Sequence, residues 1–128
     1  MLATVGAYQE AQTLTADPPR LMLLLFDGAT RFLRRAVKAL ARGEQAQFAQ
    51  ALSRAHAIIE ELADSLNHES GGEIAFNLAR LYAFMLLHLT QGLIEKDPAH
   101  LERVLGLLAT LREGFEQAVA TMSRDPLA

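Results

Sequence analysis

Residues 17–43 read DPPRLMLLLFDGATRFLRRAVKALARG and have the pattern of one complete helix. Asp17 is a favourable N-cap residue, and Pro18 is tolerated at the first helical position because its missing N–H is not needed there. Apolar side chains then recur every three or four residues. Gly43 follows at the place where a glycine commonly ends a helix. The stretch therefore predicts a helix over residues 18–42.

The rest of the chain repeats this pattern three times. The four predicted helices cover residues 18–42, 44–66, 72–95 and 98–122. Short connections between helices of similar length favour antiparallel neighbours. The predicted fold class is all-α, an antiparallel up-down-up-down four-helix bundle over residues 17–124. Residues 1–16 carry no sustained periodicity and are predicted to form a flexible N-terminal segment.

Composition excludes several classes of function. The chain has 128 residues, which is one-domain length, and no cysteine, so disulfides and thiolate sites are excluded. Its net charge of −3 argues against non-specific nucleic-acid binding, which needs a strong positive field. Apolar runs such as residues 21–26 are far shorter than the ~20 residues that a membrane span needs. The first residues lack a secretory-signal pattern, and we expect a cytoplasmic protein without membrane insertion.

The chain carries more apolar side chains than a small bundle can bury. Hydrophobic residues make up 51% of it, and residues 81–89 read LYAFMLLHL, apolar on nearly every side of a helix. One interpretation is a wide core with scattered apolar atoms on the surface. The other is an exposed groove that receives an amphipathic helix of a partner.

Searches for catalytic and metal-binding motifs favour a binding protein over an enzyme. No histidine follows a glutamate at the Glu-x-x-His spacing of di-iron bundles, and no HExxH, GxSxG or P-loop motif occurs. We therefore expect no metal and no cofactor. His88, with Gly92 four residues later, partly matches histidine phosphotransfer domains, but Thr90 and Gln91 depart from their motif. A phosphotransfer module using His88 and a helical homo-oligomerisation domain stay as alternatives.

A row of basic residues follows one side of the first predicted helix. It consists of Arg31, Arg35, Lys38 and Arg42, with Arg34 beside it. One interpretation is a solvated face that pairs with the acidic residues Glu60, Glu61 and Asp64. The other is a contact surface for an acidic partner.

Motifs spread over almost the whole chain form a family pattern. Tyr8, the turn TADP at residues 15–18 and LMLLLFDGA at residues 21–29 come first. The third predicted helix opens with GGEIAFNLARLY, residues 71–82. In these motifs the chain resembles the flagellar secretion chaperone family FliS. It departs from the family where Phe115 stands in place of a common tryptophan.

The resemblance implies a chaperone without catalytic activity. Such proteins bind the disordered C-terminal segment of flagellin in apolar grooves, prevent premature filament polymerisation and keep flagellin competent for flagellar type III secretion. Further partners implied are the export gate and other flagellar regulatory or co-chaperone proteins. The resemblance also implies that residues 1–16 cover part of the groove when no client is bound, with Tyr8 and Leu14 as apolar anchors.

On each predicted helix, one row of apolar residues is expected to face the core. Apolar residues outside these rows, the main stripes, are the further candidates for client contact. Together with the two N-terminal anchors, the predicted client-binding residues are Tyr8, Leu14, Leu23, Leu33, Val37, Tyr82, Phe84 and Leu87. Gly28 is expected to permit close helix packing. Asp27 and Asn77 are expected to make hydrogen bonds between helices or to a loop.

Overall fold

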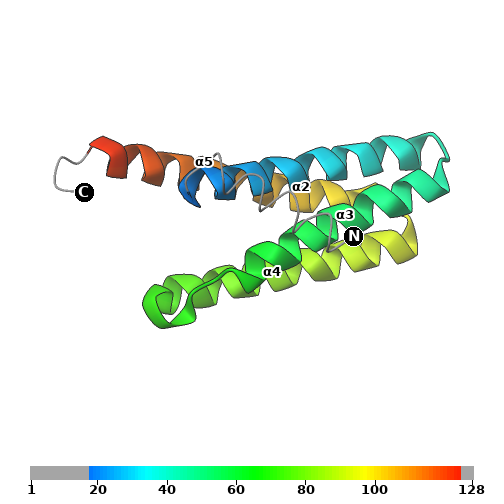
Figure 1. Cartoon of the computed structure of the whole chain (residues 1–128). Helices are drawn as coiled ribbons and strands as arrows, with labels where there is room; N and C mark the ends of the chain where they lie inside the picture. The colour runs from blue at the N-terminus through cyan, green and yellow to red at the C-terminus, as the bar shows by residue number, and fades with distance from the viewer. Residues whose placement is uncertain (1–17, 125–128) are drawn as a thin grey trace.

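The computed structural model describes residues 18–124, and these residues form four helices joined by short turns (Figure 1). The helices are α2 (Pro18–Ala41), α3 (Gln45–Asp64), α4 (His68–Glu95) and α5 (Pro98–Arg124). The prediction of an all-α four-helix bundle is confirmed. The predicted N-terminal segment lies outside the described residues.

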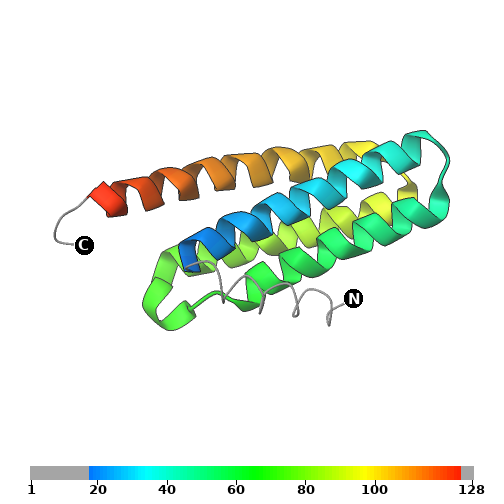
Figure 2. The same ribbon diagram turned by 45° about the horizontal axis from the view of Figure 1, so that its top comes forward.

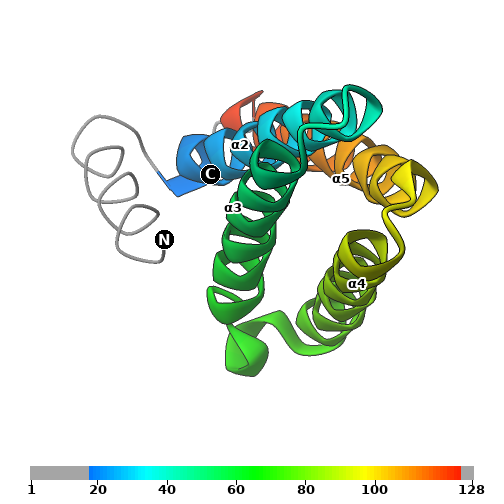
Figure 3. The ribbon, with the colours of Figure 1, turned by 90° about the vertical axis from the view of Figure 1, so that its right-hand side faces the viewer.

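In cross-section, the four helices lie at the corners of a square. α2 packs against α3 and α5, and α4 packs against the same two helices. Successive helices run in opposite directions (Figure 2), and the view along the bundle places α2 and α4 at opposite corners (Figure 3). The outer faces of α2 and α4 therefore point to opposite sides of the molecule.

The contact between α2 and α3 is the most extensive in the bundle, because small residues line it. Ala29 and Ala36 of α2 and Ala55 of α3 are completely buried. A Cβ atom on Gly28 would lie 3.3 Å from Ile58 Cδ1, so the absence of a side chain lets the two helices approach. The expected packing function of Gly28 is confirmed.

An ion pair links α2 to α5. Arg112 Nε donates to Asp27 Oδ1 at 2.6 Å, and Arg112 Nη2 donates to Asp27 Oδ2 at 3.3 Å. This hydrogen bonding to the Asp27 carboxylate raises the pKa of Arg112. The prediction that Asp27 makes a bond between helices is confirmed.

The turns use local chemistry that the sequence indicates in part. Gly43 has a φ of 72°, as a helix-ending glycine should. The Asn67 side chain accepts a hydrogen bond from the Ser70 N–H and starts α4 earlier than expected. One helical turn follows, and the backbone then breaks at Gly72, whose φ is 52°. The long regular part of α4 therefore starts after Gly72.

Gly92 is buried at the point where the end of α4 meets the start of α5. A Cβ atom there would lie 2.6 Å from Leu101 Cδ1 and 3.2 Å from His100 Cβ. We expect Gly92→Ala to lower the free energy of unfolding by about 1–3 kcal/mol through overpacking, measured by urea denaturation. Gly106→Ala is the matched control, because no atom lies within 4 Å of its Cβ position. The control should gain up to ~1 kcal/mol from helix propensity, and a stable Gly92→Ala variant would contradict the packing.

Candidate functional site

The outer face of α4 is apolar and exposed. Within residues 19–121, for which burial is described, every large hydrophobic side chain that is exposed lies on this helix: Ile74, Phe76, Phe84, Leu87, Leu93 and Ile94. We define the α4 outer face as Phe76, Phe84, Leu87 and Ile94, of which Leu87 is 56% and Ile94 is 74% exposed. Several large apolar side chains exposed on one helix of a small protein mark an interaction site.

The same face includes residues that sequence reasoning missed. Phe76 and Ile94 are exposed, although neither was among the predicted client-binding residues. Their spacing contains the signal, since Phe76, Ala83, Leu87 and Ile94 follow at intervals of i, i+7, i+11 and i+18. Ile74 and Leu93, which the helical pattern places in the core stripe, are exposed as well. The core stripe of α4 is therefore narrower than its periodicity suggests.

An apolar cavity of about 250 Å³ opens near one end of the bundle. Its lining includes Met22, Phe26, Leu66, Leu78, Tyr82, Leu111 and Phe115. The rings of Phe26 and Phe115 meet edge-on, with centroids 6.1 Å apart. Tyr82 is buried, and burial raises the pKa of its hydroxyl to about 12. No charged residue lines the cavity, so it can take an apolar side chain.

The structure separates the predicted client-binding residues into three groups. Phe84 and Leu87 are exposed on α4. Leu23 and Val37 are half-buried on α2, and Tyr82 is buried in the cavity wall. Tyr8 and Leu14 lie outside the described residues. For each of these residues, contact with a client stays a prediction.

Leu33 lies in the core, and the expectation that it lies off the main stripe is wrong. It is completely buried, with an exposed fraction of 0%. It belongs to the core cluster, to which all four helices contribute. A side chain in this position cannot contact a client unless the bundle opens.

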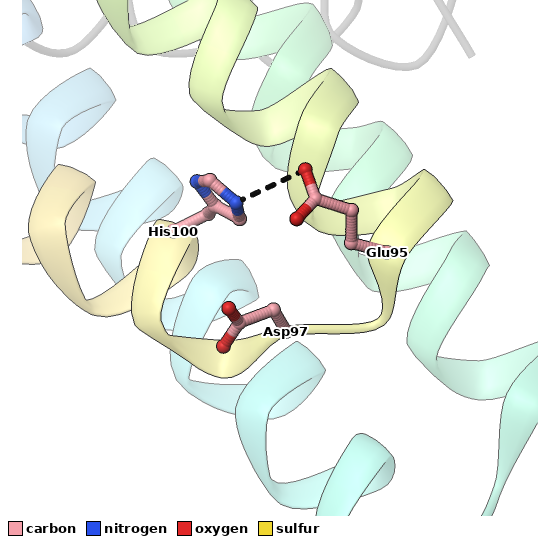
Figure 4. Close-up of side chains that lie close together, drawn as sticks. All are labelled: Glu95, Asp97 and His100. Atoms are coloured by element: carbon pink, nitrogen blue, oxygen red, sulfur yellow. Dashed lines mark ion pairs between the residues drawn. The ribbon is translucent and has the colours of Figure 1, made fainter.

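Two histidines join the end of α4 to the start of α5. His88 Nδ1 lies 2.9 Å from His100 Nδ1. On its other side, His100 Nε2 lies 3.4 Å from Glu95 Oε2, as Figure 4 shows. His88 is half-buried, and its ring meets the Phe84 ring edge-on, with the two ring centroids 4.3 Å apart. Phosphotransfer needs an exposed histidine, so this geometry speaks against the phosphotransfer alternative.

The turn that follows α4 contains the cluster best placed to share a cation. Ligand atoms of Glu95, Asp97 and His100 all lie within 4.8 Å of one another. Asp97 Oδ1 already accepts a hydrogen bond from the Ala99 N–H at 3.0 Å. The cluster therefore helps to close the turn between α4 and α5.

The histidine contact predicts a pH-dependent stability. Burial, with the nearby charges of His100 and Arg103, lowers the pKa of His88 below its ordinary value of 6.5. On acidification the unfolded chain therefore binds a proton at His88 before the folded chain does. The stabilising contribution is complete above pH 6.5 and is lost as the pH falls through the folded pKa.

We expect His88→Gln to reduce the loss of stability between neutral and mildly acidic pH. Thermal unfolding at a series of pH values measures this loss. His68→Gln is the control, because His68 is exposed at the start of α4. A wild-type slope in the His88→Gln variant would show that another group is responsible.

The basic row on α2 does not pair with the acidic residues of α3. The ion pairs described are His56–Glu60, His100–Glu95, Arg112–Asp27 and Arg112–Glu116, and none of these joins the basic row to the acidic residues of α3. Gly28 lies beside Ile58, so the antiparallel register sets Glu60 and Asp64 against the start of α2. The basic residues lie farther along α2, beside the start of α3. The expected pairing is therefore absent.

Comparison with known proteins places the chain in a family. The profile of the family described as "Flagellar protein FliS" matches residues 1–122. The chain belongs to the FliS family. The predicted resemblance is thus confirmed over nearly the entire chain.

FliS proteins of several bacteria are similar to this chain. It is 39% identical to the flagellar secretion chaperone FliS of Salmonella typhimurium over 109 residues, 84% of this chain and 81% of that protein. It is 30% identical to the flagellar secretion chaperone FliS of Bacillus subtilis, covering 93% and 88% of the two chains. It is 35% identical to the flagellar secretion chaperone FliSB of Pseudomonas aeruginosa, covering 84% and 85%. The names of these relatives describe chaperones and agree with the prediction of a binding protein rather than an enzyme.

None of the helices in residues 18–124 is both long and apolar enough to cross a membrane.

Proposed function

We propose that this FliS chain is a cytoplasmic export chaperone that binds the disordered C-terminal segment of flagellin. Binding prevents premature filament polymerisation and keeps flagellin competent for flagellar type III secretion. The observation that carries the proposal is the α4 outer face, since no described helix covers it. The names of the FliS relatives support the chaperone activity.

The dimensions of the α4 outer face suit a helical client. Phe76 and Ile94 are separated by 18 residues of sequence, or about 27 Å at 1.5 Å per residue. A client helix of similar length can lie along this face with its own apolar side inward. The apolar cavity near Tyr82 offers room for a further client side chain.

The energetics of such binding are favourable. Full burial of one large apolar side chain contributes about 1.5–3 kcal/mol. The α4 outer face carries four of them. Ordering a disordered segment costs about 2–5 kcal/mol or more. Burial of the complete face therefore outweighs the ordering cost, whereas burial of one side chain does not.

Titration calorimetry with a peptide of the C-terminal segment of flagellin from the same organism tests the proposal. We expect saturable binding with a large negative heat-capacity change, because apolar surface is buried as the peptide folds. A peptide of the same composition in scrambled order is the control. Absence of binding by a folded, helical chain would contradict the proposal. Light scattering over a range of concentrations then tests the self-association alternative.

Residues 1–16 would act as a competitor for the client. We propose that Tyr8 and Leu14 occupy part of the apolar surface until the client displaces them, which lowers the apparent affinity. We propose the flagellar export gate and other flagellar regulatory or co-chaperone proteins as further partners.

A further inference from the structure

Half of the basic residues of the chain lie on α2, in the turn after it and in the middle of α3. We define the basic patch as Arg31, Arg34, Arg35, Lys38, Arg42 and Arg54, six of the 12 basic residues. No acidic residue occurs between Gly28 and Gly43. Within the described part of the chain, none of the six forms an ion pair. The basic patch therefore creates a local positive field on a chain whose net charge is −3.

Two guanidinium groups of the patch lie over one aromatic ring. Arg35 Cζ is 5.4 Å and Arg54 Cζ is 5.6 Å from the centroid of the half-buried Phe32 ring. The ring attracts each cation through its quadrupole and holds both in place, although the two cations repel each other. An anion bound between them would relieve this repulsion.

A cavity of about 220 Å³ opens at this point. It is lined by Phe32, Arg35, Gln47, Gln50, Ala51 and Arg54. Phe32 and Ala51 make its apolar part, and the guanidinium and carboxamide groups provide hydrogen-bond donors. The lining contains no carboxylate. This combination suits an anionic group that has an apolar neighbour.

We propose that the basic patch docks an acidic segment of a partner polypeptide. One carboxylate of the segment lies between Arg35 and Arg54, and an adjacent apolar side chain contacts Phe32. Planar guanidinium groups bind carboxylates through paired hydrogen bonds, which favours this arrangement. The row from Arg31 to Arg42 extends about 16 Å along α2, and the remaining carboxylates of an extended segment pair with it.

The patch favours a polypeptide over a nucleic acid. Single-stranded nucleic acids use exposed aromatic side chains on which their bases stack. Phe32 is half-buried and already carries two guanidinium groups. The net charge of −3 also opposes a polyanion as long as a nucleic acid.

The basic patch and the α4 outer face can be occupied at the same time. The patch lies mainly on α2, and α2 and α4 occupy opposite corners of the bundle (Figure 3). An acidic partner on α2 therefore leaves α4 accessible to its own ligand. The inference does not depend on the proposed flagellin binding, since it rests on different residues.

Fluorescence anisotropy with a labelled peptide tests the proposal on the complete chain without flagellin. The probe carries glutamates on both sides of a central phenylalanine, and the control peptide has glutamine in place of each glutamate. At low ionic strength we expect saturable binding of the acidic peptide and at least about tenfold weaker binding of the control peptide. The affinity should fall as salt is added, because the contacts are exposed charges. Equal binding of both peptides, or no binding of either, would overturn the proposal.

Variants locate the site. The double variant Arg35→Gln/Arg54→Gln should bind the acidic peptide about tenfold more weakly or worse. The double variant Arg31→Gln/Lys38→Gln should lower the affinity for the acidic peptide by a smaller factor. Because both residues are exposed, this variant should fold normally. Arg103→Gln on α5 is the control and should change the affinity less than about twofold. Circular dichroism verifies the fold of each variant.

Two outcomes of the variant series would overturn the proposal. One is unchanged peptide affinity in both patch variants. The other is tighter binding of a single-stranded oligonucleotide than of the acidic peptide, with the same dependence on Arg35 and Arg54. The second result would assign the patch to nucleic acid.

Discussion

Replacing Phe84 and Leu87 together with serine should weaken binding of the flagellin C-terminal peptide about 100-fold. Each side chain contributes about 1.5 kcal/mol or more when a client buries it, and 1.4 kcal/mol corresponds to a factor of ten. The free energy of unfolding should fall by only about 1 kcal/mol, because both side chains are exposed and the main contact that is lost is that of the Phe84 ring with His88. Calorimetry measures the affinity, and urea denaturation measures the stability.

Leu93→Ser is the matched control for this double variant. Leu93 is a large apolar residue on the same helix and is 39% exposed. It lies six residues after Leu87, which places it on a different side of α4. The control should change the affinity less than about threefold. If the double variant binds like the wild type, the client does not lie on the α4 outer face.

Replacing Leu33 with alanine should lower the free energy of unfolding by about 2–5 kcal/mol. The side chain is completely buried in the closely packed core, so its removal leaves a cavity that the neighbouring helices only partly fill. Leu33→Met, which conserves volume, should cost less than about 1.5 kcal/mol. Urea denaturation of the two variants makes the comparison.

The same variant tests whether Leu33 contacts the client. The folded fraction of Leu33→Ala should bind the flagellin peptide like the wild type, once the affinity is corrected for unfolded chain. A loss of stability without a loss of affinity would assign Leu33 to the core alone. A loss of affinity in a variant of unchanged stability would contradict the observed burial. Aspartate at this position would bury an unpaired charge and is expected to unfold the bundle.

Local signals predicted much of what the structure contains. The helix-ending Gly43 agrees with the observed end of α2 at Ala41, whereas Asp17 lies outside the described residues. The run LYAFMLLHL indicated a helix with apolar residues on several sides, and Phe84 and Leu87 are indeed exposed. These features depend on propensity, caps and periodicity, which act within a few residues of each other.

Other features arise only when helices meet. Leu33 is completely buried in a core cluster to which all four helices contribute, so its burial depends on how the helices pack together. His88 and His100 are twelve residues apart in sequence, and the α4–α5 turn brings their rings into contact. The sequence by itself determined four amphipathic helices, an apolar surplus on the third and a basic row on the first. The tertiary structure alone decided which apolar residues face solvent and kept the basic row apart from the acidic residues. The physical reason is that burial and charge pairing depend on the register and spacing between helices, whereas helix formation depends on neighbouring residues.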